Sequence, residues 1–173
     1  PALAEATNCF DDEKKDFLNI KNLWVKNHDG TIHKNIVRPY EQNLDNFPMP
    51  DWSIYPDTAF YKPFKGKVYK YGDFEMSRGC PYKCSYCINV QMQAIYKSTG
   101  ENYHREKSIK RVIEEIKYAK EKYEIEFIKF WDETFLLMSK ERLEEFDELY
   151  SKEIGIPYVI ETTAKSIAPH SPI

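Results

Sequence analysis

The second half of the chain alternates between strand-like and helix-like segments, and this order constrains the fold more than any other feature of the sequence. Short apolar runs of β-branched and aromatic residues are typical of strands, and apolar residues at intervals of three and four are typical of amphipathic helices. Strands are expected over residues 74–78, 125–131 and 158–160, and helices over 108–123 and 140–153. Strands that alternate with helices pair in parallel, so the sequence predicts an α/β fold.

The first 72 residues follow another pattern. A short helix is expected over residues 1–10, and the Asn-His-Asp-Gly segment at 27–30 lies between β-forming runs, which predicts a hairpin. Five prolines alternate with aromatic residues over 37–66, so this stretch is expected to form neither a helix nor a central strand. The expected organisation is a segment with a small β-hairpin at 1–36, a linker rich in proline and aromatic residues at 37–72, and an α/β domain at 73–173.

Composition and charge limit the kinds of binding partner that we expect for this protein. The net charge is −3 and the sequence pI is about 5.9, so nucleic acid is not expected as the main partner. No apolar run approaches the roughly 20 residues that span a bilayer, and the first residues lack the pattern of a signal peptide. We therefore expect a cytoplasmic protein with no membrane partner. The charged residues of 108–123, Arg111 and Glu115 among them, are expected to form a solvated helix face.

Three of the four cysteines fall within eight residues, as Cys80, Cys84 and Cys87. The spacing C-x3-C-x2-C, directly after an expected strand, gathers three soft thiolate ligands in one loop, which favours an iron–sulfur cluster or zinc. A structural zinc site uses four protein ligands, whereas a cluster held by three leaves one iron open for a small molecule. Three alternatives stay open at this point: disulfides, zinc with Cys9 or His104 as a fourth ligand, and cysteines without a ligand role.

Residues 76–87, Met-Ser-Arg-Gly-Cys-Pro-Tyr-Lys-Cys-Ser-Tyr-Cys, resemble the signature loop of the radical S-adenosylmethionine (radical SAM) superfamily. The resemblance implies that Cys80, Cys84 and Cys87 hold a 4Fe–4S cluster and that S-adenosylmethionine chelates its open iron. It implies that Tyr86 lies beside the adenine of this cofactor. It also implies a small-molecule substrate and a one-electron donor such as flavodoxin or ferredoxin.

Flanking motifs narrow the resemblance to the branch of this superfamily that carries an N-terminal cobalamin-binding domain. These motifs stand at 20–35, 38–52, 105–108, 112–116 and 130–135. The resemblance implies that 1–36 is the C-terminal remnant of a cobalamin-binding-like domain and that 73–173 is the first half of a partial (β/α) barrel. It also implies that Asp132 and Glu133 approach the methionyl group of the cofactor. The Asp-x-His-x-x-Gly motif that ligates cobalamin in this branch is absent, so any cobalamin would be bound by a region outside this chain.

The expected function is that of a radical SAM enzyme. Such an enzyme reductively cleaves S-adenosylmethionine on a 4Fe–4S cluster and starts radical chemistry, such as methylation or rearrangement of an unactivated carbon, here with cobalamin in the full-length protein. Two alternatives are a radical SAM enzyme without cobalamin and a zinc-binding interaction module built on the three cysteines. A radical enzyme that modifies nucleic acid gains no support from the negative net charge.

Overall fold

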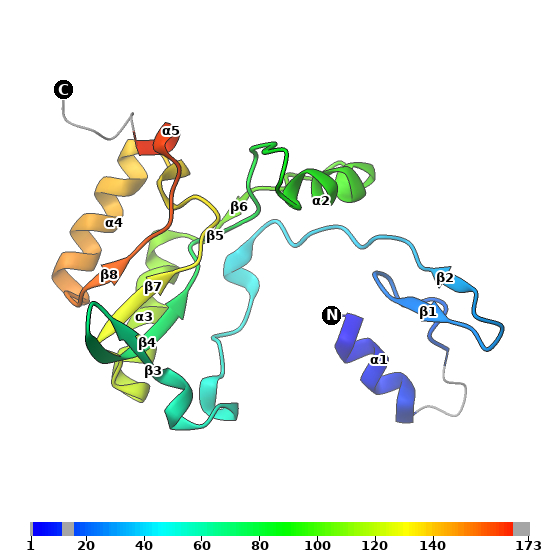
Figure 1. Cartoon of the computed structure of the whole chain (residues 1–173), viewed down its shortest axis with the longest axis horizontal. Helices are drawn as coiled ribbons and strands as arrows, with labels where there is room; N and C mark the ends of the chain where they lie inside the picture. Colours follow the sequence, from blue (N-terminus) through cyan, green and yellow to red (C-terminus); the bar gives the residue numbers. More distant parts are fainter. Residues whose placement is uncertain (1, 12–15, 168–173) are drawn as a thin grey trace. The chain divides into compact units, whose positions relative to one another are not determined.

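The structure, a computed structural model, describes residues 2–11 and 16–167 (Figure 1). The chain divides into two compact units. One, which we call the N-terminal unit, combines residues 1–41 with 83–102, and the other, the sheet unit, combines 42–82 with 103–173. The boundary along the chain therefore falls between Tyr82 and Lys83, inside the cysteine-rich loop.

The N-terminal unit contains the predicted first helix and the predicted hairpin. Its elements from the first segment are α1 (Ala2–Asp11), β1 (Trp24–Lys26) and β2 (Ile32–Lys34). The two strands pair antiparallel. Gly30 adopts a φ of +86° in the turn, and the Asp29 carboxylate accepts a hydrogen bond from the backbone N–H of Thr31 at 2.9 Å. The Asp-Gly pair therefore forms the tight turn that the sequence predicts, and both predictions are confirmed.

The second segment of the N-terminal unit forms a helix that the sequence did not indicate. This helix, α2 (Asn89–Tyr96), continues into a 3-10 turn, η4 (Lys97–Thr99). The residue before it, Ile88, provides no side-chain cap, so the usual start signal is missing. Within the unit, the ring of Tyr96 stacks on that of Tyr40 with 3.9 Å between centroids. This contact joins the two sequence segments of the unit.

The sheet unit is built on four strands in the order β3-β4-β7-β8 (Figure 1). Their bounds are β3 (Tyr61–Phe64), β4 (Lys67–Phe74), β7 (Phe127–Phe130) and β8 (Tyr158–Val159). β4 pairs in parallel with β7, and β7 with β8, whereas β3 is antiparallel to β4. Two helices follow the expected periodicity, α3 (Ile109–Tyr123) and α4 (Lys140–Glu153). The α/β fold with parallel strands is confirmed.

The remaining elements of the sheet unit are short. Three 3-10 turns cover the proline-rich stretch and a fourth follows β7: η1 (Leu44–Asn46), η2 (Trp52–Ile54), η3 (Asp57–Phe60) and η5 (Phe135–Leu137). The last helix is α5 (Ala164–Ile167). Asn43 and Asp51 cap the first two turns with their side chains. The proline-rich stretch thus forms no α-helix, as predicted.

The first strand differs from the prediction. The expected strand at 74–78 is only β5 (Ser77–Arg78), which pairs antiparallel with β6 (Arg105–Glu106), and the first parallel strand is β4. Residues expected to form a linker therefore form the β3–β4 hairpin. Lys65 and Gly66 make its turn, both at positive φ. Pro63 is accommodated because β3 lies at the edge of the sheet, where a missing N–H breaks no ladder.

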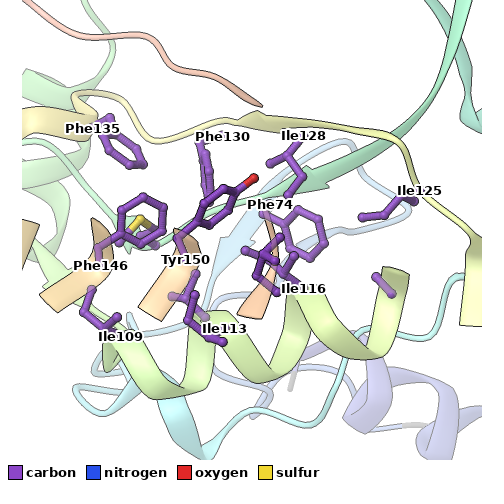
Figure 2. Close-up of a cluster of buried hydrophobic side chains, with 14 of the residues drawn as sticks. Phe74, Ile109, Ile113, Ile116, Ile125, Ile128, Phe130, Phe135, Phe146 and Tyr150 are labelled. Carbon is purple, nitrogen blue, oxygen red and sulfur yellow. The ribbon is translucent and has the colours of Figure 1, made fainter. Parts of the chain in front are cut away.

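The hydrophobic core lies between the sheet and the two long helices (Figure 2). Figure 2 shows side chains of α3 and α4 facing those of the strands: Ile109, Ile113, Ile116, Phe146 and Tyr150 against Phe74, Ile128 and Phe130. Phe130 and Phe146 are almost fully buried and pack edge to face with centroids 5.8 Å apart. Burial of each such ring stabilises the fold by about 1.5–3 kcal/mol. The core therefore fixes the ends of β4 and β7, which lead into residues 75–78 and 131–134.

One end of α3 is covered rather than solvated. Glu115 is 4% exposed, and its carboxylate pairs with Lys107 Nζ at 2.7 Å and with Arg111 Nε at 2.9 Å. A second Arg111 nitrogen donates to the carbonyl of Phe47 at 2.7 Å. The expectation that Arg111 and Glu115 lie on a solvated face is wrong, because the proline-rich stretch lies over this end of the helix.

Candidate functional site

The cysteine loop, residues 79–87, begins in the sheet unit and ends in the N-terminal unit. Cys80 is buried, and its Sγ lies 3.9 Å from the Thr134 hydroxyl, which follows β7. Cys84 and Cys87 are half-buried, and the N–H of Cys87 donates to the carbonyl of Cys84 at 3.0 Å in a turn that leads into α2. The loop directly follows the short antiparallel strand β5, and β5 in turn follows the C-terminal end of the parallel strand β4 at Phe74. The C-terminal ends of parallel strands are where α/β proteins build their sites.

All four cysteines are free thiols, so the disulfide alternative has no support. Within the part of the chain that the structure describes, no group of three or more His, Cys, Asp and Glu side chains is placed to hold a metal ion. Cys80 belongs to one unit, and Cys84 and Cys87 belong to the other. Whether these residues could hold a metal group is therefore judged from the chemistry of the cysteine sulfur atoms. Three free cysteines in a loop outside regular sheet or helix offer soft sulfur donors, which suit an iron–sulfur cluster.

The backbone at the start of the loop allows no side chain at Gly79. This residue has a φ of +85°, and a Cβ atom built on it would lie 2.3 Å from the carbonyl oxygen of Tyr103. Next to it, His104 Nδ1 lies 2.6 Å from the Gly79 carbonyl oxygen, and His104 Nε2 lies 3.5 Å from the Glu106 carboxylate. Both ring nitrogens are engaged, which argues against His104 as a zinc ligand.

Asp132 lies directly after β7 and reaches the segment that precedes the cysteine loop. Its side chain is buried, with 3% of the residue exposed. The N–H of Met76 donates to both carboxylate oxygens at 3.1 Å, and the N–H and hydroxyl of Ser77 each donate to Oδ1 at 2.6 Å. Burial raises the pKa of Asp132, while the hydrogen bonds from Ser77 and Met76 oppose this shift. The structure thus brings Asp132 to the chain that leads to Cys80.

The other two predicted cofactor contacts are exposed. Tyr86 is 92% exposed, and Glu133 is exposed beside the buried Asp132. The burial of Asp132 and the exposure of Glu133 follow from the way successive side chains point to opposite sides as the chain leaves β7. Two carboxylates that stand next to each other in the sequence therefore meet different surroundings.

A row of charged residues on the sheet was missed by sequence reasoning. Asp73 Oδ1 accepts a hydrogen bond from the Trp131 indole N–H at 2.8 Å, and the other oxygen pairs with Lys62. Lys129 pairs with Glu161 at 2.7 Å and lies 3.4 Å from the centre of the Trp131 ring. These side chains alternate with core residues along β4 and β7, so they lie on the sheet face opposite the core. The signal in the sequence was Lys129, a charge between two buried apolar residues.

The sequence suggested His104 only as a possible fourth zinc ligand, whereas the structure places its ring against the Gly79 carbonyl and the Glu106 carboxylate. Its pKa is raised, first by the hydrogen bond to Glu106. The pKa of Glu106 is lowered, first by the same contact with His104.

None of the helices in the described ranges is both long and apolar enough to cross a membrane.

Comparisons with known proteins match this chain over its greater part. The profile of the radical SAM superfamily matches residues 74–169. An uncharacterised methyltransferase of Pyrococcus horikoshii is 31% identical over 115 residues, which are 66% of this chain and 23% of that protein. The anaerobic magnesium-protoporphyrin IX monomethyl ester cyclase of Rubrivivax gelatinosus is 26% identical over 140 residues, which are 80% of this chain and 23% of that protein.

The fold is similar to that of a solved enzyme. The structure matches part of the cobalamin-dependent S-adenosylmethionine radical enzyme OxsB with a TM-score of 0.65 and 17% sequence identity. The match covers 99% of this chain and 23% of that one. The chain therefore spans 23% of the length of each of these relatives.

Proposed function

This chain belongs to the radical SAM superfamily, and from that premise we propose that the full-length protein is an enzyme that reductively cleaves S-adenosylmethionine to start radical chemistry on an unactivated carbon. The observation that carries this function is the cysteine loop with its free thiols, which lies inside the matched residues 74–169. Members of this superfamily use a 4Fe–4S cluster and S-adenosylmethionine. Held by Cys80, Cys84 and Cys87, such a cluster would supply the single electron for reductive cleavage of S-adenosylmethionine, and this cleavage would start radical chemistry on the substrate.

We assign the cluster ligands to Cys80, Cys84 and Cys87. Three thiolates leave one iron without a protein ligand, which is the position a chelating cofactor needs. Burial of Cys80 beside Thr134 shields one ligand from water and oxygen, which slows oxidation of its sulfur. The zinc alternative needs a fourth protein ligand. Of the two candidates that the sequence suggested, His104 has both ring nitrogens engaged, which leaves Cys9.

We assign the contacts to S-adenosylmethionine by asking which of the predicted residues have exposed side chains. Tyr86 and Glu133 are exposed, so an adenine ring and a methionyl ammonium are free to approach them. Asp132, the third predicted contact, is buried, and its carboxylate already accepts hydrogen bonds from Met76 and Ser77. We therefore do not retain Asp132 as a direct cofactor contact.

The sheet unit forms the first half of a partial (β/α) barrel in this account. The parallel order β4-β7-β8, with α3 and α4 between the strands, supports it, and so does the fold match to OxsB. We further propose that the full-length protein is cobalamin-dependent and cytoplasmic, that its substrate is a small molecule, and that a flavodoxin or ferredoxin donates the electron. The relatives include proteins described as a methyltransferase and a cyclase, so methylation and ring closure are the reactions to test.

Anaerobic reconstitution of the full-length protein tests this function. Iron, sulfide and zinc are quantified for the wild type and for Cys→Ser variants at positions 80, 84 and 87, with Cys9→Ser as the matched control. We expect about four irons per wild-type chain, retention of iron in Cys9→Ser, and loss of it in each of the other three. Stoichiometric zinc without reconstitutable iron would contradict the function and support the zinc-binding module.

A further inference from the structure

The segment between β4 and the cysteine loop is held by a side chain rather than by a neighbouring strand. The ladder between β4 and β7 ends where the N–H of Trp131 donates to the carbonyl of Phe74 at 2.8 Å. The next two N–H groups along the chain that point to this side belong to Met76 and Ser77, and both donate to Asp132. The carboxylate thus takes over the acceptor role of the strand where β7 ends.

The same segment is fixed from its other side. The N–H of Lys107 donates to the Met76 carbonyl at 2.8 Å, and Ser77 and Arg78 pair with β6. Three residues after Ser77 the chain reaches Cys80, which is buried. The position of the first cysteine is therefore set by contacts to residues 76–79, and Asp132 makes four of the hydrogen bonds to Met76 and Ser77.

Three donors converge on Oδ1 of Asp132, and one of them, the Met76 N–H, is shared equally with Oδ2. In all the hydrogen bonds that the structure shows at the Asp132 side chain, the carboxylate is the acceptor. The donors are two backbone N–H groups and one hydroxyl. An ionised carboxylate accepts hydrogen bonds at both oxygens and donates none. An amide of the same shape would turn an NH2 group, which donates, toward one of these donors. An amide here would keep one accepting oxygen but place an NH2 group beside the Met76 N–H, so it is expected to weaken these contacts.

We propose that Asp132 is a positioning residue for the cluster, which clamps Met76 and Ser77 so that Cys80 is held ready to bind iron. This role rests on the proposed function, because it presumes that Cys80 is a cluster ligand. Asp132 acts on the cluster through the backbone of residues 76–80 and makes no contact with S-adenosylmethionine. The neighbouring carboxylate, Glu133, is exposed and has no part in the clamp.

Four variants of the full-length protein test this role: Asp132→Asn, Ser77→Ala, the double variant, and Glu133→Gln as the matched control. The readouts are the resistance of the reconstituted cluster to an iron chelator and the affinity for S-adenosylmethionine of the cluster-loaded fraction. Loss of a group that orients a metal ligand lowers metal affinity by about 10–100-fold. We expect Asp132→Asn to lose iron at about ten-fold lower chelator concentration, and Ser77→Ala to show a smaller change in the same direction.

The double variant shows whether Ser77 and Asp132 affect the cluster through the contact between them or through a general loss of protein stability. Since Ser77 and Asp132 act through one contact, the double variant is expected to lose iron no more easily than Asp132→Asn alone. Glu133→Gln is the control for the chelator readout alone. It is expected to keep the wild-type chelator resistance and, because Glu133 is proposed to contact the cofactor, to weaken binding of S-adenosylmethionine. Binding of S-adenosylmethionine to the loaded fraction of Asp132→Asn is expected to be unchanged.

Two results would overturn this role. One is an Asp132→Asn variant with a fully resistant cluster but weakened cofactor binding, which makes Asp132 a direct contact. The other is wild-type behaviour in both readouts. If circular dichroism shows that Asp132→Asn does not fold, Ser77→Ala, which keeps the carboxylate, decides by its chelator resistance alone. Failure of the wild type to load iron would instead defeat the proposed function, and this role with it.

Discussion

Gly79 shows at the scale of one residue how tightly the start of the cysteine loop is packed. Its φ of +85° is similar to the +79° of Gly66, but a Cβ on Gly66 would meet nothing within 4 Å, whereas one on Gly79 would meet the Tyr103 carbonyl. Both glycines lie in the sheet unit. A comparison of alanine substitutions at these two glycines therefore separates the cost of backbone strain from the cost of steric overlap.

We expect Gly66→Ala to lower the free energy of unfolding by about 1–2 kcal/mol, the cost of a left-handed alanine. Gly79→Ala is expected to lower it by roughly 1–3 kcal/mol more, because the methyl group also overlaps a backbone carbonyl. Urea denaturation followed by circular dichroism measures both. Equal losses for the two variants would show that the loop relaxes freely around Tyr103.

The pair of His104 and Glu106 gives a second prediction at this scale, one for pH. The pKa of His104 is raised, mainly by Glu106, so the pair stabilises the fold when the imidazole is protonated. This contribution is fully present below the unfolded histidine value of about 6.5 and is lost as the pH rises through the higher folded value. The Glu106 pKa is lowered, so its contribution is present above its unfolded value and is lost as the pH falls through the folded one.

We therefore expect Glu106→Gln to lower the free energy of unfolding most at mildly acidic pH, between the two titrations. In alkaline solution the difference from wild type is expected to shrink to the part that Glu106 shares with Arg142, whose Nε lies 3.6 Å from its carboxylate. Denaturation curves of both proteins from pH 5 to 9 measure this difference. A difference that does not change with pH would show that His104 stays neutral throughout.

At the scale of elements, α3 carries a buried charge network that distinguishes two neighbouring glutamates. The side chains of Lys107 and Glu115 are 8% and 4% exposed, whereas Lys110 and Glu114 are 83% and 48% exposed and lie 4.0 Å apart. Breaking a buried pair leaves an uncompensated charge, whereas an exposed pair contributes little because water screens it.

We expect Glu115→Gln to lower the free energy of unfolding by about 3 kcal/mol. Glu114→Gln, one residue earlier on the same helix, is expected to change it by less than about 0.5 kcal/mol. Adding Lys107→Met to Glu115→Gln is expected to recover part of the loss, because it removes the unpaired charge. Similar small effects for both glutamates would mean that water reaches the Lys107 ammonium.

The elements that the sequence predicted well are those with their own local signals. α3 and α4 begin after Ser108 and Ser139, whose side chains accept hydrogen bonds from Arg111 and Arg142 as N-caps do. The β3–β4 hairpin was not predicted, because Pro63 argues against a central strand and nothing local shows that the strand lies at an edge. α2 was not predicted, because it has no cap and its contacts come from a distant segment, through Tyr40.

At the scale of the whole molecule, the candidate site was only partly predictable. The spacing of Cys80, Cys84 and Cys87 is a local pattern, so the sequence alone identified it. The clamp by Asp132 depends on a contact across 55 residues to Ser77, and the packing of Tyr103 against Gly79 depends on a turn in another segment. No periodicity or spacing encodes such contacts, which only the folded sheet creates.

The composition of the N-terminal unit leads to a prediction about local stability. Its second segment, 83–102, carries two of the cysteines and is joined to the first by the stacked rings of Tyr40 and Tyr96. We expect Tyr40→Ala to speed trypsin cleavage after Lys97 several-fold, because loss of the stack promotes local opening. Tyr55→Ala, which removes an exposed ring from the sheet unit, serves as the control and is expected to leave this rate unchanged. An unchanged rate in Tyr40→Ala would show that other contacts hold the segment.

The most direct test of the central claim is electron paramagnetic resonance of the full-length protein, reconstituted without oxygen and reduced, with and without S-adenosylmethionine. If Cys80, Cys84 and Cys87 hold a cluster with one open iron, the reduced protein shows a cluster signal whose g values change when the cofactor is added. A fully loaded cluster whose spectrum does not respond to the cofactor would contradict the claim that this chain provides an open iron site.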